Sequence, residues 1–449
     1  MIRRPSAIDK ITFLCLGTRG DVQPYIALAI ALKQSGFTPK IAAPLNFEAF
    51  IEQHGIDYSP IHMNTEEGLK SPEGRAWLAS GNSRAFLRHL SALMKHDRPH
   101  LQKGCWEACQ GANAIIGTAM TLSEAACLSE KLSLPMVASL IFPLLPRSSS
   151  FANFLVSPKN LPAGWMNSLT HGLVEKIAFS DVREDLNNWR AEMGLAPTRK
   201  TPSEWLQLNK TLTLHHYGGP LFQKPSDWAA HNVLTGPLFL NEANTPAYSD
   251  PKLTEFLAAG EPPVFLGFGS MPVLDPEAVL AMTARVTERL GIRAVVGAGW
   301  SQLRDSDLPK HILLLKSVDH SRLFPQCSAL VHHGGAGTTF AGLMSGKPAV
   351  VYSVFADQPF WGERLKKAGG GTHFRFSEFR EATLMSGLQH VLQPAVRDRA
   401  EQLGKQLEPE AGTASSVAEI CRYLQVGPSG WLPSAKAQSA QCRTRRGHR

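Results

Sequence analysis

The chain of 449 residues lacks any hydrophobic run that approaches the roughly 20 residues required to cross a membrane. The apolar segment at 11–16 is also too short for the core of a secretory signal peptide. Cysteine is sparse, and its seven positions are scattered and odd in number. This pattern favours reduced thiols over a disulfide framework. We therefore expect a cytoplasmic protein.

The usual short motifs for metal and nucleotide triphosphate binding are missing as well. There is no C-x-x-C pair, no H-E-x-x-H and no G-x-x-x-x-G-K-[ST]. Cys105 and Cys109 are four residues apart and could share a helix face, but no second pair completes a metal site. We expect no metal cofactor, and a Walker-type nucleotide triphosphatase is disfavoured.

Acidic residues are absent from the last part of the chain. The segment 427–449 holds five basic residues, which supply most of the net charge of +8. The remainder is only mildly basic, so we expect no nucleic-acid partner. We interpret 427–449 as a basic disordered tail, and weak attraction to anionic membrane surfaces stays open as its alternative role.

Short apolar segments alternate with helical patterns along most of the chain. Strands are expected at 11–16, 40–43, 114–117 and 135–140, and again at 263–269, 293–296, 311–315, 328–332 and 349–352. This alternation predicts an α/β fold with two doubly wound parallel sheets. We place the first domain at 1–240, the second at 241–426, and the linker within 232–251, where the composition shifts. The last helix, near 414–424, could pack back on the first domain.

One glycine-rich junction stands out in the second half. The expected strand at 328–332 runs into His332-His333-Gly334-Gly335-Ala336-Gly337-Thr338-Thr339, and a helix follows. Such a junction places free backbone N–H groups and the positive end of a helix dipole at one point, which suits a phosphate. Simple turn chemistry is the alternative. His332 and His333 alternate in direction on a strand, so they are not expected to ligate one metal ion.

Three spaced motifs together resemble a known family. They are Gly17-Thr18-Arg19-Gly20-Asp21-Val22-Gln23-Pro24, the eight residues from His332, and Asp357-Gln358-Pro359-Phe360-Trp361-Gly362. In this order they resemble the GT-B glycosyltransferases of family 1, most closely the branch with the sterol 3-β-glucosyltransferases and the macrolide and glycopeptide glycosyltransferases. The resemblance covers about 11–424 and implies two Rossmann-like domains that face a cleft. The first would bind the acceptor and the second a nucleotide-sugar donor.

The resemblance assigns the catalytic base to Asp21. An acceptor hydroxyl that attacks an anomeric carbon needs a base within hydrogen-bond reach. A structural carboxylate in the turn is the alternative for Asp21, and we expect its helix to begin near Pro24, as a first-turn proline.

The remaining matches concern the donor. His332, Gly335, Gly337 and Thr338 correspond to the diphosphate-binding turn, with Ser270 as a further diphosphate contact; His333 is assigned to packing. Asp357 and Gln358 match the pair that reads sugar hydroxyls. Val318 matches the position where backbone groups hold the nucleobase of the donor. Trp300 either stacks on the nucleobase or belongs to the core. Relatives usually differ from this chain after Val318, where Asp319-His320 stands here.

These matches predict an inverting, metal-independent transfer of a hexose, with UDP-glucose as the expected donor. The acceptor would be a hydrophobic alcohol such as a sterol, terpenoid, macrolide or lipid. The acceptor half offers no motif that identifies it. A non-catalytic nucleotide-sugar-binding protein and a nucleotide-sugar epimerase on the same fold are the alternatives.

Overall fold

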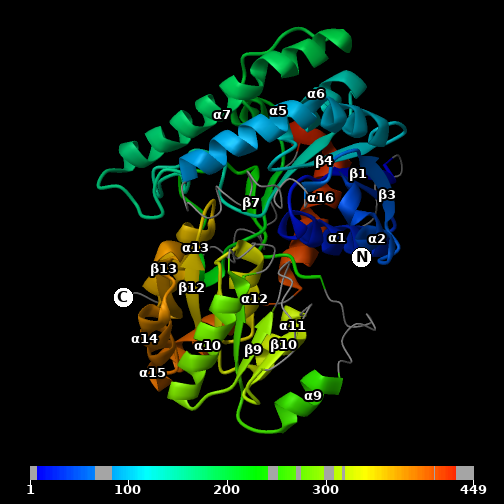
Figure 1. Cartoon of the computed structure of the whole chain (residues 1–449). Coiled ribbons are helices and arrows are strands. Elements are labelled where there is room, and N and C mark those ends of the chain that lie inside the picture. Colours follow the sequence, from blue (N-terminus) through cyan, green and yellow to red (C-terminus); the bar gives the residue numbers. More distant parts are fainter. Residues whose placement is uncertain are drawn as a thin grey trace. The chain divides into compact units, whose positions relative to one another are not determined.

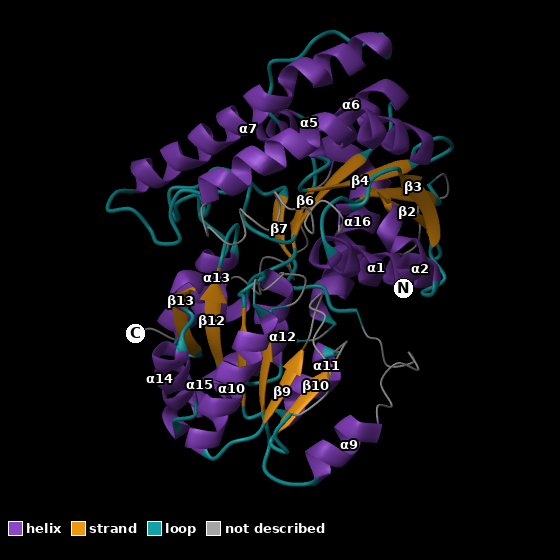
Figure 2. Cartoon of the chain, viewed as in Figure 1, coloured by secondary structure: helices purple, strands orange, loops and turns teal. Residues whose placement is uncertain are grey.

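The computed structural model describes residues 8–65, 83–240, 251–268, 275–297, 308–315, 319–408 and 410–430, with backbone alone at 83–94 and 427–430. The described residues fall into two compact units. The first consists of 8–65, 87–240 and 410–430. The second consists of 251–408 with the gaps just given, and 83–86 are grouped with it. Each is an α/β unit with a parallel sheet, as the alternating sequence pattern predicts (Figures 1 and 2).

The first unit contains a seven-stranded sheet in the order β3-β2-β1-β4-β5-β6-β7. All of its neighbouring strands run parallel. The strands are β1 (Lys10–Leu14), β2 (Thr38–Pro44), β3 (Asp57–Ile61), β4 (Ala114–Thr118), β5 (Met136–Leu140), β6 (Thr213–His215) and β7 (Asn232–Leu234). Its helices are α1 (Arg19–Gln34), α2 (Glu48–Glu52), α5 (Ser83–Ala108), α6 (Leu122–Leu132), α7 (Gly164–Glu192), α8 (Pro202–Leu208) and α16 (Ala411–Gly430).

Successive residues of a strand point to opposite faces of the sheet, so each strand serves two cores. Ile11 and Phe13 of β1 pack with α1, α2 and α16. Leu14, on the other face, packs with α5, α6 and α7. Helix α16 therefore belongs to the first unit, although the second unit precedes it in the chain. The helix extends to Gly430, and 431–449 lies outside the described residues.

The second unit contains a six-stranded sheet in the order β10-β9-β8-β11-β12-β13, also parallel. Its strands are β8 (Val264–Gly267), β9 (Ala294–Gly297), β10 (Ile312–Leu315), β11 (Ala329–His332), β12 (Ala349–Ser353) and β13 (Gly371–Arg375). Its helices are α9 (Pro251–Ala258), α10 (Pro276–Leu290), α11 (His320–Leu323), α12 (Ala336–Met344), α13 (Gln358–Ala368), α14 (Glu381–Val391) and α15 (Pro394–Gly404).

Both sheets reverse their strand order at one position. The first reverses between β1 and β4, and the second between β8 and β11. In open parallel sheets, ligands bind outside the carboxyl ends of the strands at this switch point. The segments that follow β1 and β11 are the ones that carry Asp21 and the glycine-rich turn. The switch points of the two sheets therefore coincide with the segments that carry the first two sequence motifs.

Candidate functional site

Asp21 lies in the first turn of α1, which corrects the expectation that this helix begins near Pro24. The helix begins at Arg19, and Pro24 lies inside it. Thr18 is the N-cap: the Asp21 carboxylate accepts hydrogen bonds from the Thr18 backbone N–H (2.8 Å) and the Thr18 hydroxyl (3.0 Å). This capping box starts the helix five residues before Pro24.

The Asp21 carboxylate is partly buried, and its electrostatic setting suits a base. Burial raises its pKa above the ordinary value of 3.8, while the two hydrogen bonds from Thr18 oppose that rise. Both hydrogen bonds from Thr18 go to Oδ2 of Asp21. The carboxylate thus combines a structural contact through one oxygen with a raised proton affinity.

The absence of a side chain at Gly17 leaves room for the Asp21 carboxyl group. Its φ of +131° is a conformation that other residues rarely adopt, and a Cβ at this position would collide with the Asp21 carboxyl group. We expect Gly17→Ala to reduce turnover by displacing Asp21. The matched control is Gly111→Ala, because Gly111 has φ of +75° and nothing within 4 Å of an added Cβ.

Both variants should lose stability in thermal unfolding, about 1 kcal/mol for Gly111→Ala, because both force a side chain onto unfavourable backbone. Gly17→Ala should lose more, because only its added Cβ collides with a neighbouring side chain. Steady-state kinetics should then separate them: only Gly17→Ala should lose activity beyond what its stability explains. Equal activity in the two variants would show that the position of Asp21 is immaterial.

The glycine-rich turn connects β11 to α12. His332 ends the strand and is fully buried. Its Nδ1 accepts a hydrogen bond from the Gly334 backbone N–H at 3.0 Å, so the neutral ring carries its proton on Nε2. Burial lowers the pKa of His332 well below 6.5, and His333 and His320 add to the effect. His332 is therefore a neutral N–H donor near neutral pH.

Three buried polar atoms around this turn have no hydrogen-bond partner among the described residues. They are His332 Nε2, His333 Nδ1 and Thr339 Oγ1. Buried polar groups in proteins are nearly always paired, so a cluster of unpaired ones calls for an explanation such as a ligand. The adjacent helix α12 begins without a side-chain cap, at Gly335. The uncapped amides of its first turn are oriented for an anion.

The glycines of the turn differ in what they require. Gly334 has φ of +90°, and a Cβ there would lie 2.6 Å from Val351 Cγ1 and 3.0 Å from the Gln358 carbonyl oxygen. A Cβ on Gly335 would meet the ring of His333 at 2.6 Å, so His333 packs on this glycine. Gly337 is exposed, and nothing lies within 4 Å of an added Cβ. Its neighbour Thr338 is partly buried in the same helical turn.

Asp357 and Gln358 lie at the start of α13, next to the turn. The Gln358 backbone approaches Gly334, so the two motifs are in contact. Gln358 Oε1 accepts hydrogen bonds from the backbone N–H groups of Val354 (2.9 Å) and Phe355 (3.3 Å). Asp357 Oδ2 accepts one from Trp361 Nε1 at 2.7 Å. Each motif side chain therefore has one oxygen committed to shaping this loop.

A second network, which sequence reasoning missed, anchors the same loop. His373 of β13 contacts Ser353 Oγ through Nε2 (2.7 Å) and Glu363 Oε1 through Nδ1 (3.0 Å). Burial lowers the pKa of His373, so the neutral ring donates to Glu363 and accepts from Ser353. Nothing in the sequence around His373 signals this role, because it arises from the pairing of β12 with β13.

Three further predicted donor residues, Ser270, Trp300 and Val318, lie outside the described residues. In the sequence, each follows the last residue of a strand by three positions: Gly267 of β8, Gly297 of β9 and Leu315 of β10. His332 is the register partner of Gly267, so β8 ends beside the glycine-rich turn. Among the described residues, no three histidine, cysteine, aspartate or glutamate side chains lie close enough together to hold a metal ion.

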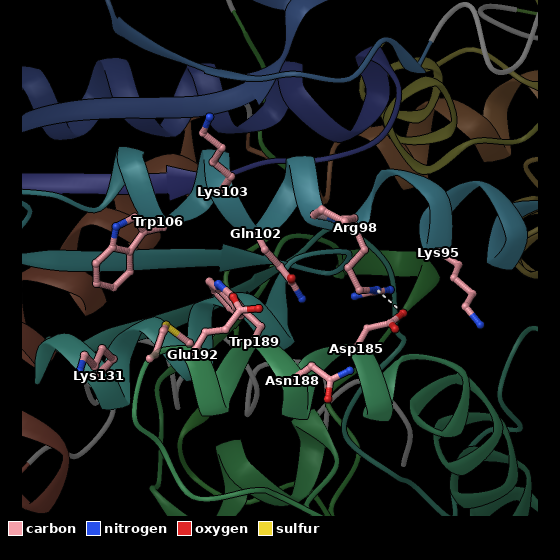
Figure 3. Close-up of a pocket in the computed structure, with 12 residues that line it drawn as sticks. Lys95, Arg98, Gln102, Lys103, Trp106, Lys131, Asp185, Asn188, Trp189 and Glu192 are labelled. Carbon is pink, nitrogen blue, oxygen red and sulfur yellow. Dashed lines mark ion pairs between the residues drawn. The ribbon is translucent and has the colours of Figure 1, made fainter.

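A pocket of about 700 Å³ lies elsewhere, among α5, α6 and α7 of the first unit (Figure 3). Arg98 and Asp185 point toward each other across it, with Arg98 Nε 3.8 Å from Asp185 Oδ2. Arg98 also forms a buried ion pair with Glu124 at 2.9 Å. None of the predicted site residues lines this pocket, so it gives no support to the predicted chemistry.

Comparison with protein families gives two matches. Residues 11–148 match the glycosyltransferase family 28 N-terminal domain, and residues 276–424 match the domain described as erythromycin biosynthesis protein CIII-like, C-terminal. The first match covers part of the first unit, and the second covers most of the second unit together with part of α16. They include all three motifs, and of the predicted site residues only Ser270 lies outside them.

Several sterol 3-beta-glucosyltransferases are similar to the chain over nearly its whole length. One from Emericella nidulans is 30% identical over 94% of this chain. Two from Arabidopsis thaliana are 29% and 31% identical over 96% and 95% of it. The chain spans only 30% of the length of the Emericella protein, against 70% and 66% of the two plant proteins.

Solved structures share the fold at low sequence identity. The calicheamicin glycosyltransferase CalG4 has a TM-score of 0.66 at 16% identity, covering 93% of this chain and 98% of that one. The glycosyltransferase VinC, solved with dTDP, has a TM-score of 0.60 at 18% identity, covering 92% and 99%. Both family domains, the glucosyltransferase relatives and these folds agree with the motif-based resemblance. The chain belongs to the GT-B glycosyltransferases, in the branch that contains the sterol 3-beta-glucosyltransferases.

Proposed function

We propose that the protein transfers glucose from UDP-glucose to the hydroxyl group of a sterol-like alcohol, with inversion at the anomeric carbon. The observation that carries the donor half of this proposal is the cluster of unpaired His332 Nε2, His333 Nδ1 and Thr339 Oγ1 beside the uncapped start of α12. A diphosphate would supply the missing acceptors. The acceptor half rests on the names of the relatives.

The proposed reaction is a single displacement. The acceptor oxygen forms a bond to the anomeric carbon as the bond from that carbon to the β-phosphate oxygen breaks. The hydroxyl proton passes to the Asp21 carboxylate, and UDP leaves with the bonding electron pair. Neutral N–H donors at the turn and the amides of α12 would stabilise the charge that develops on the leaving group. Asp357 and Gln358 would hold the sugar hydroxyls, a role that suits one carboxylate and one amide.

The loop between β12 and α13, which carries Asp357, is anchored by His373, and this anchoring can be tested by itself. His373→Leu removes both of its hydrogen bonds, so the loop before α13 should loosen. We expect the KM for the nucleotide sugar to rise about three- to tenfold, while the Kd for UDP, which lacks the sugar, stays unchanged. Glu363→Gln keeps an acceptor for His373 Nδ1 and should preserve most of the sugar affinity. Equal weakening of UDP and of the nucleotide sugar would count against a role in reading the sugar.

Donor and acceptor identity is best tested by a matrix of both. UDP-glucose and dTDP-glucose are incubated with a sterol, a macrolide and a flavonoid, and the products are detected by mass spectrometry. We expect glucoside only with UDP-glucose and the sterol-like alcohol. A preference for dTDP-glucose would contradict the proposed UDP-glucose donor. Nucleotide-sugar epimerisation without any alcohol would overturn the transfer reaction, and binding of donor without any product would indicate a non-catalytic protein.

A further inference from the structure

Helix α1, which carries Asp21, has a gap in its backbone hydrogen bonds directly after its first turn. Pro24 has no backbone N–H, so the helix lacks the bond that residue 24 would donate to the Gly20 carbonyl. Tyr25 is the first residue after this gap, and an α-helix directs its backbone N–H to the Asp21 carbonyl. Asp21 and Tyr25 are four residues apart and share one face of the helix. The position of Tyr25 therefore bears directly on that of Asp21.

The side chain of Tyr25 joins α1 to the first sheet. It is 1% exposed, and its hydroxyl donates to the Ser139 carbonyl oxygen at 2.8 Å. Ser139 pairs in register with Thr118, the last residue of β4, so the contact lies where the pairing of β4 with β5 ends. Burial raises the pKa of the Tyr25 hydroxyl well above its ordinary value, and Cys15 and Asp21 add to the rise. Tyr25 is thus a neutral donor near neutral pH.

Ser139 is held in turn by the buried side chain of His216. The Ser139 hydroxyl lies 2.6 Å from His216 Nε2, and Thr235 Oγ1 lies 2.9 Å from His216 Nδ1. Thr235 Oγ1 also contacts two carbonyl oxygens, at 3.2 Å for His215 and 3.3 Å for Gly236. Because a carbonyl oxygen can only accept, we assign the Thr235 proton to a carbonyl and the His216 ring proton to Nδ1. His216 Nε2 then accepts from the Ser139 hydroxyl.

This network lies at the carboxyl ends of three neighbouring strands. Ser139 belongs to β5, His216 directly follows β6, and Thr235 directly follows β7. Ser416 of α16 is a further neighbour, with its Oγ 3.4 Å from His216 Nδ1. Burial lowers the pKa of His216 to about 3, and His215 adds to the shift, so the ring is neutral near neutral pH. A buried and uncharged network of this kind fixes geometry rather than supplying charge.

We propose that Tyr25 is a positioning residue: its hydrogen bond to Ser139, supported by His216, holds the first turn of α1 and with it the Asp21 carboxylate. The inference rests on the proposed function, because it requires Asp21 to be the base. The network is uncharged, so it would act on the reaction only through the placement of Asp21. A tyrosine hydroxyl that served stability alone would change the amount of folded protein and leave the rate of each folded molecule as it was.

Tyr25→Phe tests the proposal, because it removes the hydroxyl and keeps the buried ring. We expect kcat per folded molecule to fall about two- to tenfold, the factor that one neutral hydrogen bond supplies. UDP affinity and the KM for UDP-glucose should stay unchanged, because the proposed donor groups belong to the second unit. Isothermal titration with UDP counts the folded binding sites and measures their affinity, and steady-state kinetics on the same preparation give kcat and KM.

A double-mutant cycle separates positioning from general stability. In Asp21→Asn the base is gone, so the addition of Tyr25→Phe should lower kcat no further. Tyr58→Phe is the matched control, because it also removes a hydroxyl that donates to a backbone carbonyl of the same unit, that of Ala43 at 3.2 Å. It should leave kcat per folded molecule unchanged, both in the wild type and in Asp21→Asn.

Ser139→Ala removes the next hydrogen bond of the network and tests the proposal by itself if Tyr25→Phe does not fold. It should lower kcat by less than about tenfold, and only while Asp21 is present. An unchanged kcat in Tyr25→Phe, or the same fractional loss in the Asp21→Asn background, would overturn the positioning role and leave the proposed function intact. Wild-type kcat in Asp21→Asn alone would overturn Asp21 as the base, and this inference with it.

Discussion

Replacement of Asp21 by asparagine is expected to lower kcat by about 10²- to 10⁴-fold, the usual contribution of a general base, while UDP binds as before. Asparagine keeps an oxygen that can accept the hydrogen bonds from Thr18, so the start of α1 should survive. The change removes only the ability to take a proton. Isothermal titration with UDP and single-turnover kinetics on the same preparation measure the two effects.

The matched control for this variant is a second capping box in the same unit. Thr201 and Glu204 at the start of α8 bond reciprocally, at 3.0 and 3.3 Å. Glu204→Gln makes the same carboxylate-to-amide change at a helix start with no proposed chemistry. It should leave kcat within about twofold of the wild type. A comparable loss in both variants, or a loss of UDP affinity in Asp21→Asn, would assign Asp21 a structural or donor-binding role.

The pH profile of the wild type should carry the same information. The base must be ionised to accept the proton, and burial raises the pKa of Asp21 above 3.8. The rate should therefore fall as the pH drops through that raised pKa, at a higher pH than an ordinary aspartate would give. In Asp21→Asn the residual rate should lose this acid limb. An identical limb in the variant would assign it to another group.

The second large effect is expected at His332, where substitution should weaken UDP binding without removing the catalytic base. His332→Ala removes the proposed Nε2 donor to the diphosphate and the acceptor for the Gly334 N–H. A hydrogen bond to a charged group contributes about 1.5–3 kcal/mol, so UDP affinity should fall roughly 10- to 150-fold. Isothermal titration with UDP measures this loss directly.

Two substitutions separate the two functions of the His332 ring. His332→Asn keeps an acceptor near Nδ1 for the turn but lacks the Nε2 donor, so it should lose affinity like the alanine variant. His332→Gln places an amide donor nearer Nε2 and should retain more of the affinity. If the His332→Asn variant binds UDP as tightly as the wild type, the His332 ring only accepts the hydrogen bond from Gly334 and does not contact the diphosphate. Because His332 is neutral, the ratio of wild-type to Asn affinity should stay constant between about pH 6 and 8.

The sequence predicts the fold class well because the strands near both switch points are apolar and are punctuated by glycine. The edge of the first sheet was harder: β6 and β7 have three residues each, and β7 lies inside the segment that the composition shift marks as a linker. Strands this short carry too few residues for a periodic signal. Their place in the sheet depends on their parallel pairing with β5 and with each other.

The site residues show a similar division. Motif spacing indicates Asp21, the His332 turn and Asp357-Gln358, because each lies within a few residues of a strand end. The predicted start of α1 is wrong because Pro24 gives a stronger local signal than the Thr18–Asp21 capping box. His373 and the exposed leucines of α7, Leu169 and Leu173, carry no local signal at all. Both depend on which neighbours the folded chain supplies, and periodicity alone would turn the leucines of α7 inward.

The most direct test of the central claim is the stoichiometry and stereochemistry of one reaction. UDP-α-glucose is incubated with a sterol, UDP is quantified, and the anomeric configuration of the glucoside is read by proton NMR. We predict that UDP and a β-linked glucoside form in equal amounts, and only when the sterol is present. An α-linked product, or UDP released without glucoside, would contradict an inverting transfer with Asp21 as the base.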